Sequence, residues 1–413
     1  MQRGLGSFTD LATWAIDSPL IWFMLFSVAL ATASVLVRCV PAVREAATTV
    51  ENNRQTAIDG LRGVLGISVF VHHTVITWFL LQGHGWALPP SRFVVHLGQT
   101  SVALFFMITG FLFWGRVLAR GDSIDWLGFI VSRLYRLYPV YLLTLGLVVA
   151  AVFALTATGP RPSAASFMAP IVHWLLFTVF SAPDLNGLPH TSRLVAEVTW
   201  SLRYEWLFYL ALPLLAFVAG RARHKLAALL SATGLTAMCF WLERHGTFSV
   251  GILQSFLGGI VAARVVRSPA LAAAGRTPAA GLAAIAALLA VITFLPTAYT
   301  WKATLGLSLF FAVVASGHDL WGALRLPGLL WLGDITYSIY LLHGLLLWAV
   351  LQCFWPHAAA SSWPVFLGSA VTIDVILVLL SSFVFLCIER PAILLGKRHY
   401  RRFGPRRTPA RAS

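Results

Sequence analysis

The sequence predicts an all-α protein, a polytopic transmembrane helical bundle with about eleven spans. Of its 413 residues, 58% are hydrophobic and only 11% are charged, and the mean hydropathy is +0.80. Because soluble domains carry about 25% charged residues, this composition excludes an ordinary soluble protein. Apolar runs long enough to cross a bilayer recur along the chain, and most Lys and Arg residues flank them.

Each predicted span has about 20 residues, the length that the hydrocarbon thickness requires. A further apolar stretch, 167–180, is shorter and contains Pro170 and His173, so we expect an interfacial or re-entrant piece there. The predicted spans cover residues 19–40, 63–81, 99–117, 139–158, 198–218, 226–243, 248–265, 279–298, 302–317, 335–354 and 363–387.

The distribution of basic residues predicts the orientation. If the N-terminus lies outside, 23 of the 30 Lys and Arg residues are on the inside and seven are outside, as the positive-inside rule requires. The C-terminus is then cytoplasmic, and residues 392–413 form a basic tail that we expect to be disordered and to contact anionic lipid. The net charge of +15 comes mostly from residues that flank spans, so we expect the lipid bilayer as a partner and no nucleic acid. The four cysteines have no metal-ligand or disulfide spacing, and no metal site is predicted.

Ionisable residues inside the second span are the first candidates for chemistry. Desolvating such groups is expensive, so they are more often functional than incidental. His73 follows Arg62 by 11 residues, which places it about 16 Å deeper in the membrane and about 20° away around the helix. Arg62 and His73 therefore share one face, from the cytoplasmic mouth to the middle of the bilayer. His72 points away, and for it a structural role is favoured over a catalytic one.

A second candidate is the carboxylate of Glu205, inside the span 198–218. An intramembrane carboxylate faces a protein interior or a wet cavity and has a partner. An ion pair with Arg203 is disfavoured, because residues two apart on a helix do not face each other. Glu205 would orient or balance His73 if their helices pack together, a contact that sequence does not establish.

Three further sets lie on predicted helices. Arg133 and Arg136 are three residues apart on one cytoplasmic face, either as membrane anchors or as a site for phosphate, which paired guanidinium groups suit. Tyr340 and His343 are also three apart, and a satisfied core pair is their default interpretation. Gly258 and Gly259 are expected to permit close helix approach.

These segments, in this order, resemble the acyltransferase-3 family of integral membrane acyltransferases. The likeness runs from about residue 55 to residue 391. It includes "IDGLRGVLGISVFVHH" with Arg62 and His73, "SRLYRLYP" with Arg133 and Arg136, and "WSLRYEWLFYL" with Trp200, Ser201 and Glu205. "FFMITGFLFW" carries Thr109 where the family usually has serine, and Trp206 stands where a second glutamate often follows. "LGG", "TYSIYLLH" and "IERP" resemble further family elements.

The resemblance implies three segments: residues 1–54 with one extra transmembrane helix, a membrane acyltransferase domain at 55–391 built on the family's ten-span core, and the tail at 392–413. It also implies a multi-pass protein of the bacterial inner (plasma) membrane. We expect acyl transfer to be completed by the membrane domain alone or with a periplasmic partner enzyme.

The activity that the resemblance implies is transfer of an acyl group, most often acetyl, from cytoplasmic acyl-CoA to a hydroxyl of a cell-envelope or exported saccharide. Acyl-CoA is then a co-substrate, and no permanently bound cofactor is expected. His73 is predicted as general base or transient acyl carrier, Arg62 as positioner of the thioester, and Glu205 as orienter of the imidazole. Arg133 and Arg136 are predicted to hold the donor's phosphates. The predicted substrate-binding residues are Trp200, Ser201, Tyr340 and His343.

Two other classes of function fit the same residues. A proton-coupled transporter would use His73, Glu205 and Arg62 as a relay, although the chain has no visible internal duplication. A flippase or a non-catalytic saccharide-binding scaffold would need no donor site. Release of free CoA by the purified protein separates these three interpretations.

Overall fold

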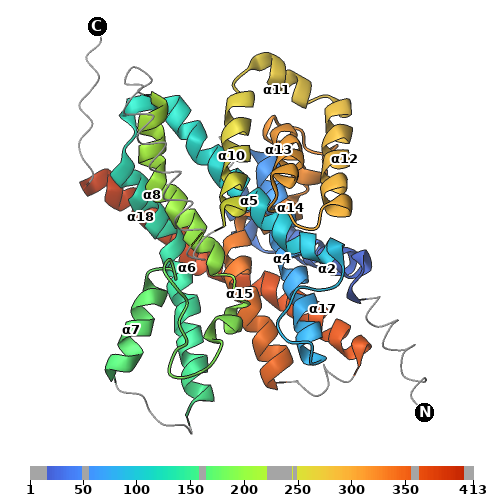
Figure 1. The fold of residues 1–413 in the computed structure, drawn as a ribbon, viewed down its shortest axis with the longest axis vertical. Coiled ribbons are helices and arrows are strands. Elements are labelled where there is room, and N and C mark those ends of the chain that lie inside the picture. Colours follow the sequence, from blue (N-terminus) through green and yellow to red (C-terminus); the bar gives the residue numbers. More distant parts are fainter. Residues whose placement is uncertain are drawn as a thin grey trace.

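The computed structural model describes residues 16–48, 55–157, 164–220, 244, 249–354 and 362–403 (Figure 1). In these ranges the chain is helical and forms no sheet. The longer helices are α2 (Pro19–Cys39), α4 (Thr56–Leu81), α5 (Arg92–Arg120), α6 (Trp126–Leu155), α8 (Trp200–Gly220), α10 (Val250–Val265), α12 (Pro278–Phe294), α13 (Trp301–Ala315), α15 (Thr336–Leu347), α17 (Trp363–Val384) and α18 (Arg390–Phe403). The shorter helices are α3 (Pro41–Thr48), α7 (Ala164–Leu175), α11 (Pro269–Gly275) and α14 (Pro327–Asp334).

The predicted all-α membrane bundle is confirmed. Seven helices of the described chain are long and apolar enough to cross a membrane, namely α2, α4, α5, α6, α8, the continuous helix at Thr336–Cys353 and the one at Trp363–Tyr400. An eighth span is α10 if it is counted with α11, to which it is joined at a bend of 112°. Two more predicted spans are the shorter apolar helices α12 and α13. The predicted span at 226–243 lies outside the described residues.

The apolar stretch 167–180 was predicted not to span the membrane. In the stretch 167–180, helix α7 has 12 residues, which is about 18 Å and too short to cross the hydrocarbon core. The chain then turns through Phe177 and Thr178, both with positive φ.

The tail 392–413 was predicted to be disordered, and this is wrong for its first part, which belongs to helix α18 and is ordered as far as Phe403. The physical reason is that α18 packs closely against α6 at two glycines, one on each helix. The ring of Tyr400 lies over Gly128 and the ring of Tyr135 over Gly396, at places where a Cβ atom would meet ring carbons at 2.5 and 2.6 Å. Tyr135 also hydrogen-bonds His399 at 2.7 Å. The tail beyond residue 403 lies outside the described part of the chain.

Helix α4 is the buried centre that positions the site. It packs against α14, α5, α15 and α2, and α5 crosses the middle of the molecule beside it (Figure 1). Gly60, Gly63 and Gly66 recur every three residues on one face, where added Cβ atoms would lie 1.9, 2.4 and 3.1 Å from Leu324, Leu329 and Thr336 respectively. The glycines of "DGLRGVLG" thus let the chain from Leu324 to Thr336 approach the helix that carries Arg62 and His73.

A second close contact, between α5 and α10, confirms the predicted role of the Gly258–Gly259 pair. A Cβ atom at Gly259 would lie 1.9 Å from the carbonyl oxygen of Met107 on α5. We expect Gly259→Ala to lower the Tm of the detergent-purified protein by about 5 °C, because overpacking costs about 1–3 kcal/mol. Gly115→Ala is the matched control, since Gly115 on α5 has nothing within 4 Å of its Cβ position. An unchanged Tm in Gly259→Ala would contradict this account of the packing.

Candidate active site

A cavity of about 460 Å³ lies among α4, α5, α6, α8, α15 and α18. It brings together residues that are far apart in the sequence. Six of the predicted site residues line it: Arg62, Arg133, Arg136, Ser201, Glu205 and Tyr340. Thr109, the hydroxyl residue at the usual serine position, lines it as well. The cavity therefore brings together residues from five separate sequence motifs.

The cavity is strongly cationic. Its lining carries five basic side chains, Arg62, Arg116, Arg133, Arg136 and Lys397, and a single carboxylate, that of Glu205. Arg116 and Lys397 were not predicted as site residues, because sequence alone presents them as charges that flank spans. Lys397 reaches the cavity because α18 is ordered. Such an excess of positive charge suits a multiply charged anion.

The arginines fall into two kinds. Arg136 forms an ion pair of 3.1 Å with Glu389, a fully buried carboxylate that also accepts a hydrogen bond of 3.0 Å from Ser338. Arg62 lies 3.6 Å from Asp59, one turn away on α4. These two guanidinium groups are therefore already held by carboxylates.

Arg116 and Arg133 are held differently. Their guanidinium groups lie 5.2 and 5.1 Å from the ring centre of Phe113, a cation–π arrangement that fixes both beside one aromatic ring. Within the described chain, no carboxylate lies within ion-pair distance of Arg116, Arg133 or Lys397. The Nε atom of Arg133 is buried and makes no hydrogen bond to the described residues. These are the groups with capacity left for a ligand.

The part of the cavity around α8 and α15 is polar but uncharged apart from Glu205. The Glu205 carboxylate accepts a hydrogen bond from Tyr209, one turn along α8. The hydroxyl groups of Ser201 and Tyr340 lie 2.6 Å apart, and Tyr340 also donates to the carbonyl of Val198 at 3.1 Å. Tyr340 thereby joins α15 to the start of α8 and places a hydroxyl group at the cavity wall.

Next to Tyr340 lies a pair of histidines. The ring of His343 lies 6.1 Å from the ring of Tyr340, centre to centre. Its Nε2 atom is 3.1 Å from Nδ1 of His73 on α4. The His73 ring is also flanked by Trp86, nearly parallel at 6.2 Å. The order from the cavity is therefore Tyr340, His343, His73.

The hydrogen bonds of this pair fix the tautomers. Nδ1 of His73 lies 3.0 Å from the carbonyl of Val69, and Nδ1 of His343 lies 3.1 Å from the carbonyl of Ile339. Because a carbonyl oxygen only accepts hydrogen bonds, each neutral ring carries its proton on Nδ1. The single Nδ1–H of His73 is then shared between two acceptors, the carbonyl of Val69 and Nε2 of His343, and Nε2 of His73 carries the lone pair. That lone pair is what a general base requires.

His72 has a structural environment, as predicted. It is buried, its Nδ1 lies 2.8 Å from the carbonyl of Val94, and its ring lies against Gly98 of α5. The two adjacent histidines thus serve different contacts: His72 joins α4 to α5, and His73 joins α4 to α15.

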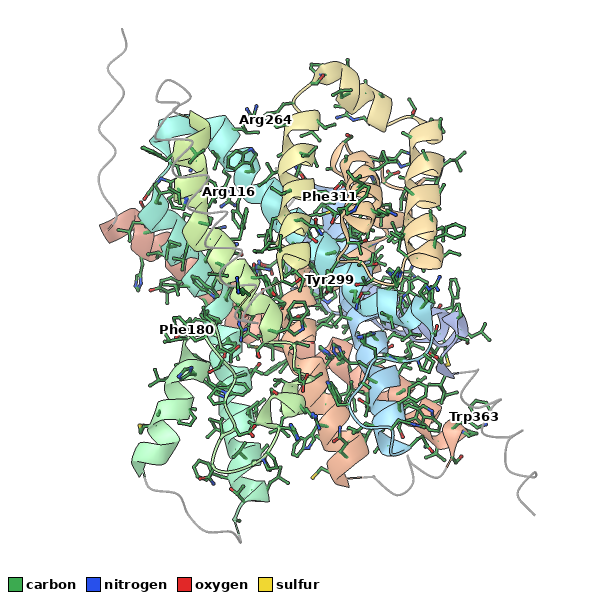
Figure 2. The ribbon with its side chains drawn as sticks, viewed as in Figure 1. Arg116, Phe180, Arg264, Tyr299, Phe311 and Trp363 are labelled. Atoms are coloured by element: carbon green, nitrogen blue, oxygen red, sulfur yellow. The ribbon has the colours of Figure 1, made fainter. Side chains whose placement is uncertain are left out.

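Other predicted residues lie elsewhere. Glu205 lines the arginine cavity, and the predicted partner of His73 is replaced by His343, whose ring contacts it. Trp200 belongs to an aromatic cluster with Tyr204 and Tyr299, at ring distances of 5.7 and 6.4 Å. Tyr299 is labelled in Figure 2. Arg203 donates to the carbonyl of Thr178 at 3.3 Å and not to Glu205, as the helical spacing predicted.

Sequence reasoning missed Glu389 as a site residue. It was noted only as part of "IERP", at the end of the last apolar run. A carboxylate at the end of a long apolar run is a signal for a buried partner, and the structure supplies that partner as Arg136.

Together the fold and the cavity define a multi-pass membrane protein with a cationic cavity next to a pair of histidines. A family model described as an acyltransferase domain, Acyl_transf_3, matches residues 55–387, which is most of the chain. The chain belongs to the acyltransferase-3 family of membrane acyltransferases.

Two relatives from bacteria are similar to the chain. The "Exopolysaccharide production protein ExoZ" of Rhizobium meliloti (strain 1021) is 28% identical over 254 residues, which cover 60% of this chain and 76% of ExoZ. The "Putative membrane-bound transacylase BcsY" of Komagataeibacter xylinus is 26% identical over 320 residues, 74% of this chain and 77% of BcsY. No solved structure gives a significant match.

Proposed function

We propose that this acyltransferase moves an acyl group, acetyl in the first instance, from cytoplasmic acyl-CoA to a hydroxyl of a cell-envelope or exported saccharide. The observation that carries the proposal is the cationic cavity whose polar end adjoins the His73–His343 pair. Acyl-CoA is a thioester at the end of a long arm on a triply phosphorylated nucleotide. A cavity with cations and a nearby base offers sites for both ends of that molecule.

The donor's phosphates are assigned to Arg116, Arg133 and Lys397, the cations without a carboxylate partner in the described chain. Arg62 and Arg136 contribute to the positive potential while their carboxylates hold them in place. Compared with the sequence prediction, this assignment keeps Arg133 as a donor ligand and gives Arg136 a mainly structural part.

The chemical step uses His73 as general base. Nε2 of His73 takes the proton of the acceptor hydroxyl as the hydroxyl oxygen forms a bond to the acyl carbon. The carbon–sulfur bond then breaks and CoA leaves as thiolate. The imidazolium returns the proton to that sulfur, giving free CoA–SH and the acylated saccharide. His343 accepts the hydrogen bond from His73 Nδ1 and stabilises the imidazolium that forms transiently.

Two observations support the proposed acceptor class and location. ExoZ is named for exopolysaccharide production, and this name favours a saccharide acceptor for the present chain as well. The excess of basic residues on one side of the predicted spans favours an inner-membrane protein with its N-terminus outside and C-terminus cytoplasmic.

The test is thioester cleavage by the purified protein in detergent. We expect free CoA to be released from acetyl-CoA, at a rate that rises when a glycan prepared from the parent strain is added. A transporter would move protons or saccharide without consuming the thioester, and a binding scaffold would release no CoA. Absence of CoA release from folded protein supplied with that glycan would therefore contradict the proposed function.

A further inference from the structure

A second, smaller cavity opens beside the first, on the side of α18. Its volume is about 270 Å³, and it lies among α5, α6, α8 and α18, with Leu212 as the lining residue from α8. Figure 2 labels Arg116, on α5 beside α8, which lines both cavities together with Phe113 and Ser132. The two cavities therefore lie on either side of the same three lining residues.

The chemistry of the smaller cavity differs from that of the larger one. Three of its wall residues are aromatic rings that the larger cavity lacks, Trp126, Phe129 and Tyr400. Arg120 adds a second cation beside Arg116, and Asp125 adds one carboxylate. A cavity with aromatic faces, two cations and one acceptor suits a phosphorylated nucleoside, whose base stacks and whose phosphate pairs with arginine.

Two polar atoms in this cavity have capacity for a ligand. The hydroxyl oxygen of Tyr400 is buried and makes no hydrogen bond to the described chain. The Asp125 carboxylate caps α6 by accepting from the Gly128 N–H through Oδ1 at 2.9 Å, which leaves Oδ2 as an acceptor. The exocyclic amino group of a nucleobase can donate a hydrogen bond to Oδ2 of Asp125, whereas a hydrocarbon ligand has no donor for it.

We propose that this cavity binds the adenosine 3′-phosphate end of the acyl-CoA donor. The adenine stacks on Tyr400 and Trp126, and Arg120 pairs with the 3′-phosphate. The remaining phosphates pass Arg116 into the larger cavity, so that the pantetheine arm runs toward Tyr340. This assignment rests on the proposed function, because it takes acyl-CoA as the donor.

In this proposal, helix α18 contributes ligand-binding residues to both cavities. Without it the cavity would lack Tyr400 and the larger cavity would lack Lys397. The glycine contacts at Gly128 and Gly396 hold α18 against α6 at the distance that the cavity needs.

The first experiment measures binding independently of catalysis. Adenosine 3′,5′-bisphosphate, the nucleotide end of CoA, is titrated into the purified full-length protein by calorimetry. We expect saturable binding to the parent protein, and binding weakened about tenfold in Tyr400→Ala, because the stacking of the base on the tyrosine ring is lost. No binding to the parent protein, or equal binding to both proteins, overturns the proposal.

The second experiment separates this proposal from the proposed function. The ratio of kcat/KM for acetyl-CoA to kcat/KM for acetyl-pantetheine, a donor without the nucleotide, is measured for each variant. We expect Tyr400→Ala and Trp126→Ala each to lower the ratio about tenfold. A similar fall is expected in Arg120→Gln when acetyl-CoA is compared with its 3′-dephospho analogue.

Trp301→Ala is the matched control. It removes an exposed aromatic residue at the start of α13, outside both cavity walls and outside the α6–α18 contact. The control is expected to keep the parent's ratio. A ratio unchanged in Tyr400→Ala and Trp126→Ala would overturn the nucleotide site while leaving acyl transfer intact. Failure of both donors with the parent protein would instead remove the proposed function, and the binding experiment would then decide the nucleotide site alone.

Discussion

His73→Ala is expected to lower kcat for acyl transfer by about 10²–10⁴-fold, the range that a positioned general base contributes. The protein should stay folded, because the His73 side chain is only partly buried and, within the described chain, its one contact with another side chain's polar atom is the hydrogen bond to His343. CoA release is measured together with Tm. The matched control is His84→Ala, which removes an exposed histidine beyond the end of the same helix and should leave kcat within about twofold.

The partner histidine allows a finer test. His343 is expected to act by positioning His73, so His343→Leu should lower kcat about tenfold with little change in the KM for either substrate. His343→Gln should restore part of the loss, because its amide oxygen can accept from His73 Nδ1–H. Parent-like kcat in His73→Ala would remove the histidine from the mechanism. Equal losses in His343→Leu and His343→Gln, each with reduced Tm, would show that His343 is needed only for packing.

Arg136→Ala is expected to destabilise the fold by about 3–5 kcal/mol, because it leaves the fully buried Glu389 carboxylate without its cation. Tm in detergent measures the effect. Adding Glu389→Gln to Arg136→Ala should recover most of the loss, since the charge that lacked a partner is then removed. Without that recovery, the ion pair would not be the source of the stability.

Arg133→Ala is the contrasting variant, three residues away on the same helix. It should raise the KM for acetyl-CoA about tenfold and leave Tm nearly unchanged, because Arg133 has no carboxylate partner within the described chain. If Arg133→Ala and Arg136→Ala behaved alike in both measurements, the division of the arginines into ligand and structural groups would be wrong.

The parts of the site that sequence predicts are those that depend on one helix at a time. Composition and the lengths of the apolar runs predict the membrane bundle, and helical spacing separates His73 from His72. The same spacing makes Tyr340 and His343 neighbours on α15 and excludes a pair between Arg203 and Glu205. Each of these predictions needs only the 3.6-residue period.

Contacts between helices are beyond such reasoning. Glu205 was a reasonable partner for His73 because both are intramembrane ionisable groups, yet helix packing brings His343 to that position. The pairing of Arg136 with Glu389 joins residues that are 253 positions apart, and no local pattern specifies it.

The C-terminal tail is a second case in which a contact between helices could not be predicted from sequence. Its basic composition is typical of disordered, lipid-contacting segments. Two glycines, Gly128 on α6 and Gly396 on α18, allow a close helix contact instead. Because that contact involves residues on both helices, the composition of the tail alone does not reveal it, and with it Lys397 and Tyr400 become candidates for ligand binding.

The mass of the surface and secreted glycans tests the central claim most directly. We compare the parent strain with a strain lacking this protein, complemented either with the parent sequence or with His73→Ala. The expected result is that glycans from the deletion strain and from the His73→Ala strain are lighter by the same acyl mass, which for acetyl is about 42 Da per acylated site. Complementation with the parent sequence should restore that mass. Glycans of identical mass in all four strains would contradict the account.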